Sequence, residues 1–197
     1  MHHLSLSHAA PFLTMAGLSR RHVATTPPAV GRVAPDCELS TTQGKIVRLS
    51  EMVGKGAIVL IVLRGYLDHK CPFCNLQLYD FAHNAQAFVQ IAARVVMVYP
   101  GSRQDLSAHA EKFMSDRNFP SNFKMLLDPD YRFTSLYGLR WNAPNETAYP
   151  STFLIDRSGV IFFSKIVKGH GGGRTTAAEV LNELPRPSTR RYRSITL

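Results

Sequence analysis

The sequence contains few cysteines, no long apolar run and few acidic residues, and each shortage excludes a class of protein. Three cysteines among 197 residues are too few for a secreted domain that disulfides hold together. The longest apolar run, Ala57–Leu63, is far shorter than the ~20 residues of a membrane-spanning helix, so we expect no membrane partner. We therefore expect the chain to work in a reducing compartment, the cytoplasm.

Acidic residues are outnumbered, with 14 Asp and Glu against 23 Lys and Arg, which gives a formal net charge of +9. Most of the excess lies at the two ends, because residues 1–36 carry three arginines and one aspartate and residues 185–197 carry four arginines. Basic ends can contact nucleic acid or anionic surfaces. The chain shows no nucleic-acid-binding motif, however, so we expect no nucleic-acid partner.

The chain divides into one domain and two tails. Residues 1–29 contain no acidic residue and no convincing hydrophobic period, which predicts a disordered extension. Their composition also fits an organelle transit peptide, or a start codon assigned too far upstream, with Met15 as the alternative start. Residues 185–197 are predicted to be a basic tail. Residues 30–184 are long enough to bury one hydrophobic core.

Within residues 30–184, strand-like and helix-like patterns alternate, and a hairpin and a last helix follow them. The expected strands are 46–49, 57–63, 95–99, 123–127, 152–156 and 160–167. The expected helices are 71–92, 103–117, 131–137 and 175–184. Pro100 and Gly101 are expected to end the strand that precedes them. The alternation predicts an α/β domain with a mixed sheet.

The most informative stretch is Cys71-Pro72-Phe73-Cys74, which joins a buried strand to a long helix. Cys71 falls at the expected N-cap and Pro72 at the first helical position, where a missing N–H costs nothing. The first-turn amides and the helix dipole then face the Cys71 sulfur and favour the reactive thiolate. The sequence therefore predicts a low pKa for Cys71.

The helix dipole does not by itself account for a fully ionised thiol. A dipole worth up to about 2 kcal/mol lowers a cysteine pKa from about 8.5 to about 7. Three basic residues close by in the sequence are candidates for the remaining stabilisation, namely Arg64, His69 and Lys70. For His69 and Lys70, a solvent-exposed position without a role is the simpler interpretation.

Cys74 lies one turn after Cys71 and starts an apolar face that continues through Leu78, Phe81, Ala85, Phe88 and Ala92. An exposed attacking thiol and a sheltered second thiol within disulfide reach make a redox pair. The alternatives are two inert cysteines or half of a zinc site. Structural zinc usually needs four ligands, and the only other cysteine, Cys37, lies far upstream, so we expect no metal. We interpret Cys37 as a small buried apolar residue rather than a resolving thiol.

These features together resemble a known family. The order of strand, C-x-x-C helix, strand, helix and closing hairpin resembles the thioredoxin-like fold. Arg64 and the segment Cys71–Leu78 resemble the bacterial peroxiredoxin-like branch of the alkyl hydroperoxide reductase/thiol-specific antioxidant (AhpC/TSA) family. Val33–Asp36 and Phe153–Ile161 support the likeness, which covers roughly residues 30–184. The resemblance implies a three-layer, thioredoxin-like α/β fold, in which helices flank a central mixed sheet.

The chain departs from the family pattern at three positions. Arg64 stands where the peroxidatic motif has a proline, Asp68 where it has a threonine, and Pro150 where the family has an arginine. The usual hydroxyl and guanidinium donors are thus absent from their usual positions, and Arg64 is the candidate substitute. Tyr149-Pro150 instead resembles the cis-proline that faces the dithiol in thioredoxins. We therefore expect a cis peptide bond and a groove-forming role at Pro150.

The resemblance implies a thiol-dependent antioxidant oxidoreductase that needs no cofactor. Cys71 would attack a disulfide or a peroxide, and Cys74 would resolve the product into a Cys71–Cys74 disulfide, which a thioredoxin or glutathione system would reduce. Because the usual donors are missing, disulfide reduction is expected to be faster than peroxide reduction. The alternative is a redox-sensing or binding module that switches without turnover. The oligomeric state is left open.

Serine substitutions separate the roles of the two motif cysteines. Cys71→Ser should abolish thiol-dependent turnover, whereas Cys74→Ser should permit one reaction and accumulate a mixed disulfide or a sulfenic acid. Mass spectrometry after one equivalent of oxidant identifies the trapped species. Cys37→Ala is the control and should keep activity. Loss of the first attack in Cys74→Ser alone would mean that the roles are reversed.

Overall fold

The computed structural model describes residues 26–65, 71–169 and 172–185. Outside the described residues lie three positions that the sequence singles out, namely Asp68, His69 and Lys70. Most of both tails also lies outside them, so the domain boundaries stay predictions. Across the described ranges, no helix is both long and apolar enough to cross a lipid bilayer.

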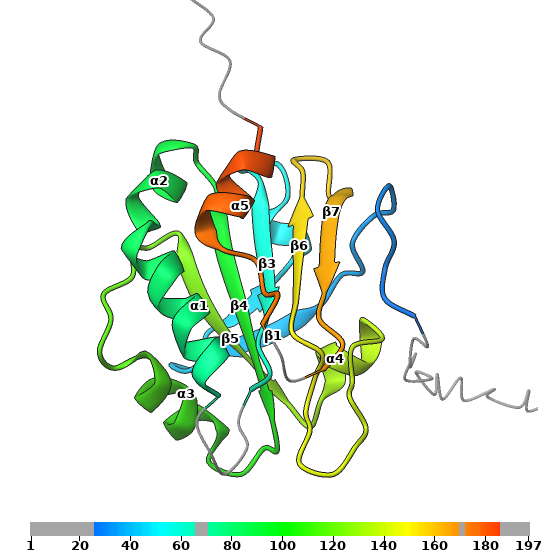
Figure 1. The fold of residues 1–197 in the computed structure, drawn as a ribbon. Helices are drawn as coiled ribbons and strands as arrows, with labels where there is room; N and C mark the ends of the chain where they lie inside the picture. Colours follow the sequence, from blue (N-terminus) through cyan, green and yellow to red (C-terminus); the bar gives the residue numbers. More distant parts are fainter. Residues whose placement is uncertain (1–25, 66–70, 170–171, 186–197) are drawn as a thin grey trace, which may run out of the picture.

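A seven-stranded mixed sheet forms the centre of the fold, with the strand order β2-β1-β5-β4-β3-β6-β7. The strands are β1 Glu38–Thr41, β2 Ile46–Arg48, β3 Ile58–Val62, β4 Arg94–Gly101, β5 Phe123–Pro129, β6 Ser151–Ile155 and β7 Ile161–Ile166 (Figure 1). Strands β3, β4 and β5 pair in parallel, and the remaining pairs are antiparallel. Because β6 is antiparallel to both β3 and β7, the carboxyl ends of β3 and β7 lie at the same edge of the sheet.

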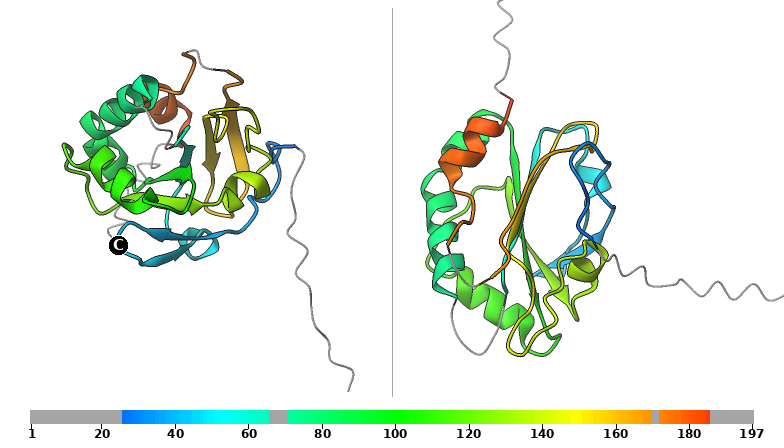
Figure 2. Two further views of the ribbon diagram at one scale, coloured as in Figure 1. Left: turned by 90° about the horizontal axis from the view of Figure 1, so that it is seen from below. Right: turned by 45° about the vertical axis from the view of Figure 1, so that its right-hand side comes forward.

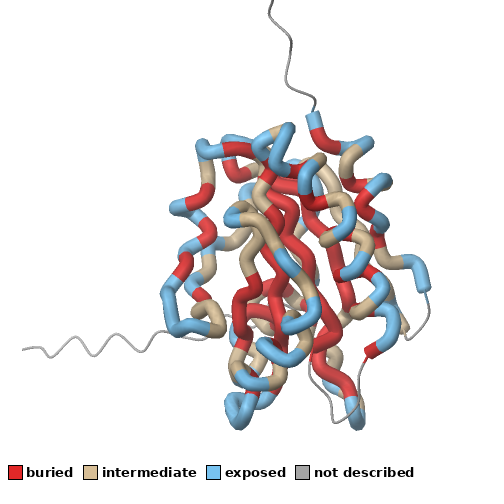
Figure 3. The backbone as a smooth tube through the Cα atoms, turned by 90° about the vertical axis from the view of Figure 1, so that its left-hand side faces the viewer, coloured by how far each residue is buried: buried red, intermediate tan, exposed pale blue. Residues whose placement is uncertain are grey.

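Helices and loops cover both faces of this sheet. One face carries α1 Pro72–His83, α2 Ala85–Gln90, α3 Leu106–Met114 and α5 Ala177–Glu183. The other face carries the 3-10 helix η1 Ser50–Met52, α4 Arg132–Leu136 and the segment that leads into β1 (Figure 2). Buried residues concentrate in the sheet between these layers (Figure 3). The three-layer α/β architecture predicted from the sequence is confirmed.

Strand β3 shows why the sheet is apolar on both faces. Val59 and Ile61 pack with the four helices α1, α2, α3 and α5. The alternate residues Ile58, Leu60 and Val62 pack toward η1 and α4. All five are at most 1% exposed, and each buried aliphatic side chain contributes about 1.5–3 kcal/mol. Burial on both faces therefore holds β3 in place, and with it the start of the segment that leads to the Cys71–Cys74 motif.

The single helix predicted over residues 71–92 is in fact two helices. Asn84 ends α1, and its Nδ2 donates to the carbonyl oxygen of Asp80 at 2.9 Å. Helix α2 begins at the next residue. Ala92 has a φ of +53° and is exposed, so it lies beyond α2 and off the predicted apolar face. The break was missed because Asn84 lies inside an otherwise regular apolar period.

The prediction that Pro100 and Gly101 end their strand is also wrong, because β4 includes both residues. Strand β3 pairs with β4 only as far as Val98. Beyond Val98, β3 has no carbonyl group that would need an N–H from β4, so the missing N–H of Pro100 is tolerated. Pairing with β5 continues through Gly101 and keeps the strand regular.

Gly65 lets the chain turn closely against β4 on its way to the motif. Its φ is +79°, and a Cβ at this position would lie 1.9 Å from the carbonyl oxygen of Pro100. Only glycine satisfies both the left-handed backbone and the close approach. The path from β3 to Cys71 therefore depends on this residue.

Replacing Gly65 tests that close approach. Gly44 has a similar φ of +77° but open space around it, so Gly44→Ala is the matched control for backbone strain alone. Gly44→Ala should lower the free energy of unfolding by about 1–2 kcal/mol, and Gly65→Ala should lower it by clearly more. Urea denaturation measures both losses. Equal losses would contradict a steric requirement at Gly65.

Candidate active site

The two motif cysteines lie where the chain enters the N-terminus of α1, close to the carboxyl end of β3. Cys71 is the N-cap with an extended backbone, and Pro72 opens the first turn, as the sequence predicts. The backbone N–H of Cys74 donates to Cys71 Sγ at 3.3 Å. Helix α1 therefore presents its positive end to the Cys71 sulfur.

Both thiols are more enclosed than expected. Cys71 is 8% exposed and Cys74 is 2% exposed. Cys74 starts the buried face of α1 as predicted. The expectation of an exposed Cys71 is wrong, because its side chain packs in the same core cluster as Cys74. Low exposure strengthens every electrostatic contact that the Cys71 sulfur makes.

Arg174, which the sequence analysis missed, lies against both sulfurs. Its Nη2 is 3.6 Å from Cys71 Sγ and 3.7 Å from Cys74 Sγ. Its guanidinium also lies over the Phe73 ring, 5.4 Å from the centroid. Arg174 follows β7, whose carboxyl end shares a sheet edge with that of β3. Only the strand order of the sheet brings the segment after β7 close to the end of β3. The local sequence does not reveal that these two strands run in the same direction.

The two cysteines differ in acidity. A hydrogen bond from the Cys74 thiol is the main cause that lowers the pKa of Cys71 to about 6. The Cys74 N–H and the charges of Arg174 and Arg64 lower it further, while burial opposes them. The pKa of Cys74 is raised, because its thiol donates to Cys71 and because it is buried. Near neutral pH, Cys71 is therefore mainly a thiolate and Cys74 a thiol.

Arg64, the expected substitute for the missing guanidinium, is bound to Glu146. Its Nε and Nη2 each donate to a carboxylate oxygen of Glu146 at 2.8 Å, and Nη2 also donates to the carbonyl oxygen of Asn145 at 3.2 Å. Both ionic partners are buried. The carboxylate offsets the charge of Arg64, which is the smallest of the contributions to the Cys71 pKa. Glu146 was missed because it lies 82 residues along the chain from Arg64.

The cis bond expected between Tyr149 and Pro150 is wrong, because the described residues contain no cis peptide bond. The trans chain continues into β6, and the Pro150 carbonyl accepts from the Val167 N–H at 2.9 Å. Pro150 is buried. Its neighbour Ser151 pairs with Val62, so Pro150 lies beside the carboxyl end of β3. Its groove-forming role stays a prediction.

The third cysteine lies on the other face of the sheet. Cys37 packs against the core cluster that contains η1 and α4, apart from the cluster of Cys71 and Cys74. Burial and the charges of Asp36 and Asp128 raise its pKa to about 12. A protonated thiol is a poor nucleophile. The position agrees with the predicted packing role, although Cys37 is only partly buried.

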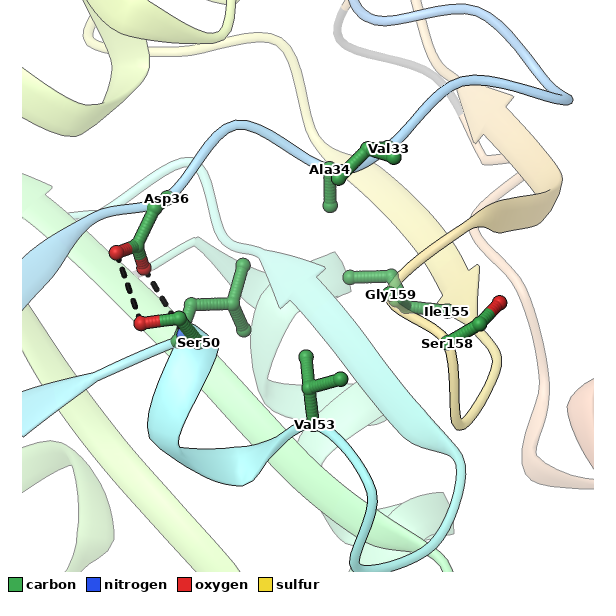
Figure 4. Close-up of a pocket in the computed structure, with 9 residues that line it drawn as sticks. Val33, Ala34, Asp36, Ser50, Val53, Ile155, Ser158 and Gly159 are labelled. Atoms are coloured by element: carbon green, nitrogen blue, oxygen red, sulfur yellow. Dashed lines mark hydrogen bonds between the residues drawn. The ribbon is translucent and has the colours of Figure 1, made fainter.

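A pocket of about 240 Å³ opens on that same face, between the segment before β1, η1 and the β6–β7 turn (Figure 4). Its one ionisable lining group, Asp36, accepts from the N–H and the hydroxyl of Ser50 at 2.9 Å and 2.8 Å. The pocket contains no sulfur, and we assign it no reaction. Within the described ranges, no group of three or more His, Cys, Asp and Glu side chains could hold a metal ion.

Comparison with known proteins identifies the family of this chain. The family model described as "AhpC/TSA family" matches residues 30–164. Peroxiredoxin Bcp of Bacillus subtilis (strain 168) is 30% identical over 136 residues, which cover 66% of this chain and 80% of that protein. The chloroplastic peroxiredoxin Q of Sedum lineare is 24% identical over 160 residues, which cover 81% of each chain.

Two solved structures share the fold. A peroxiredoxin-like protein from Aquifex aeolicus superimposes with a TM-score of 0.63 at 22% identity, covering 81% of this chain and 87% of that one. The peroxidoxin BcpB from Mycobacterium tuberculosis superimposes with a TM-score of 0.58 at 21% identity, covering 70% and 84%. At these identities the structures bear on the fold alone, and they confirm the predicted thioredoxin-like class.

Removing the charge of Arg174 should raise the pKa of Cys71. The rate at which iodoacetamide alkylates Cys71 should rise with pH through a midpoint near 6, because only the thiolate reacts. In Arg174→Gln that midpoint should move up by about 1 pH unit or more. Arg103→Gln removes the same charge from an exposed pair with Asp130 and should leave it unchanged. An unshifted midpoint in Arg174→Gln would show that its charge does not act on the thiolate.

Proposed function

Since the chain belongs to the AhpC/TSA family and is a peroxiredoxin-like oxidoreductase, we propose that it reduces peroxides through the Cys71–Cys74 dithiol. The observation that carries the proposal is the contact between the Arg174 guanidinium and Cys71 Sγ. This contact joins an ionised nucleophile to a charged hydrogen-bond donor beside the place where the oxidant must react.

In the first step, the Cys71 thiolate attacks one oxygen of the peroxide. A sulfur–oxygen bond forms and the O–O bond breaks, so Cys71 becomes a sulfenic acid and the departing oxygen takes up a proton. Negative charge moves from the sulfur to the departing oxygen during this step. Arg174 lies next to the sulfur, where charge-assisted hydrogen bonds can stabilise that transfer.

In the second step, Cys74 resolves the sulfenic acid. The Cys74 thiol loses its proton, its sulfur attacks the Cys71 sulfur, and the hydroxyl group leaves as water, which yields a Cys71–Cys74 disulfide. An external thiol donor of the thioredoxin or glutathione type then returns two electrons. Such donors are kept reduced in the cytoplasm, where we propose that the protein works.

Because of Arg174, we rank the rates of peroxide reduction and disulfide reduction differently from the ranking that the sequence predicts. The sequence predicts slow peroxide reduction because Asp68 and Pro150 replace the threonine and the arginine of the family pattern. Arg174 supplies a guanidinium from a different segment, so we propose peroxide reduction as the main reaction. Disulfide exchange by the same dithiol is the second, because it needs only a thiolate and a resolving thiol.

Arg174→Gln should slow peroxide reduction far more than disulfide exchange. Both rates are measured by stopped flow at a pH where alkylation shows Cys71 fully ionised in wild type and variant, which removes the pKa effect. Loss of one charge-stabilising donor should lower the hydrogen peroxide rate about 10²–10³-fold. The rate with glutathione disulfide should change by less than about threefold. Equal decreases of the two rates in Arg174→Gln would contradict a specific role of Arg174 in peroxide reduction.

A further inference from the structure

The backbone before Arg174 offers little to hold its guanidinium in place. Gly172 and Gly173 precede it, both are exposed, and Gly173 has a φ of +94°. A Cβ at either glycine would meet no described atom within 4 Å, so the space beside both residues is open. Glycine also has the largest backbone freedom of all residues. The position of the guanidinium therefore depends on contacts of the Arg174 side chain itself and on the residues that follow it.

Thr175, the next residue, is fixed by buried hydrogen bonds to two elements of the fold. Gln77 Nε2, on α1, donates to the Thr175 carbonyl oxygen at 3.1 Å and to Thr175 Oγ1 at 3.3 Å. Thr175 Oγ1 also shares a hydrogen bond of 2.7 Å with Thr152 Oγ1 in β6. All three residues are buried. The backbone directly after Arg174 is therefore held by both α1 and the sheet.

Helix α1 supplies its contacts from the side that carries the second cysteine. Cys74, Gln77 and Asp80 follow one another at intervals of three residues, so they lie along one side of α1. The Asp80 carboxylate accepts from the N–H of Ala177, at the start of α5, which lies beside α1 (Figure 1). The helix that presents both sulfurs therefore also holds the segment 174–177, from which the guanidinium reaches them.

Gln77 is a poor residue for packing alone. It is 6% exposed, and its Oε1 has no hydrogen-bond partner within the described part of the chain. A buried acceptor without a partner costs free energy, which an apolar side chain of similar size would avoid. Departures of this kind from good packing are typical of functional sites. The two bonds to Thr175 therefore explain the amide better than the stability of the core does.

We propose that Gln77 is a positioning residue of the dithiol site, whose amide holds the Arg174 guanidinium against Cys71 Sγ through Thr175. The inference rests on the proposed function. Gln77 lies six residues after Cys71, about 9 Å along the helix axis, so it acts through Arg174 and not on the peroxide. Without the two bonds, the segment that carries Arg174 can move away from α1. A displacement of about 1 Å can lower a rate about a hundredfold.

Gln77→Met removes both bonds to Thr175 and keeps an unbranched side chain that adapts to the space. At a pH where alkylation shows Cys71 fully ionised, it should lower the hydrogen peroxide rate about 10–10²-fold. The glutathione disulfide rate should change by less than about threefold. The midpoint of the pH profile of Cys71 alkylation should rise by at least about 0.5 pH unit, because the guanidinium lies farther from the sulfur.

A double-mutant cycle with Arg174→Gln shows whether Gln77 acts through the guanidinium. In the Arg174→Gln background, Gln77→Met should change the hydrogen peroxide rate by less than about twofold and the alkylation midpoint by less than about 0.2 pH unit. A merely structural role of Gln77 would lower the rate by the same factor in both backgrounds. Urea denaturation of the four full-length proteins verifies that each is folded.

Thr152→Val tests the same hydrogen-bond chain from the side of the sheet. Valine keeps the shape of threonine but lacks the hydroxyl that bonds Thr175 Oγ1. The hydrogen peroxide rate should fall at least about threefold, and Thr152→Ser, which keeps a hydroxyl, should recover most of it. Thr134→Val is the matched control. It removes a buried hydroxyl from α4, on the other face of the sheet, and should leave the rate unchanged.

Two results would overturn the positioning role: an effect of Gln77→Met that is equal with and without Arg174, or no effect at all. If Arg174→Gln itself has no effect, the role is refuted as well, because Gln77 has nothing to position. The proposed peroxidase function fails separately. A wild-type protein that does not form the Cys71–Cys74 disulfide with hydrogen peroxide refutes peroxide reduction. Alkylation midpoints that respond to Gln77→Met only when Arg174 is present would still support the positioning role in that case.

Discussion

One buried negative charge, the thiolate of Cys71, is the constraint on which the rest of the site depends. A thiolate with little contact to water is stable only where other groups replace its hydration. Here the Cys74 thiol and N–H donate to the sulfur, and the Arg174 guanidinium lies beside it. The acidity of Cys71 is therefore a property of the motif, the start of α1 and the segment before α5 together.

The buried pair of Arg64 and Glu146 limits the electric field that acts on this charge. Because the two groups bind each other through both carboxylate oxygens, the pair is neutral as a whole. Arg174 is then the stronger cationic contribution at the sulfur. Removing one partner of a buried ion pair typically costs about 3–5 kcal/mol. The pair thus fastens the loop that carries Glu146 to the end of β3 as well as balancing charge.

Features that depend on neighbouring residues could be predicted from the sequence, whereas contacts between distant segments could not. The Cys71 N-cap, the first-turn proline and the buried strand before them were all readable from neighbouring residues. The break at Asn84 was not, because capping by its side chain interrupts a period that the apolar residues continue. Arg174 lies 103 residues from Cys71, and its position became visible only once the strand order showed which ends of β3 and β7 meet. The peptide bond between Tyr149 and Pro150 is trans, so this segment differs from the cis-proline segment of thioredoxins that the sequence resembles.

The distance in sequence between the dithiol and Arg174 has a consequence for a growing chain. When the ribosome has synthesised the motif but not yet β7 and Arg174, the nascent chain contains both cysteines without the guanidinium that helps to ionise Cys71. Such a chain has a less acidic Cys71, and therefore less of the thiolate that oxidants attack. Sensitivity to oxidants thus matures together with the last part of the domain to be synthesised.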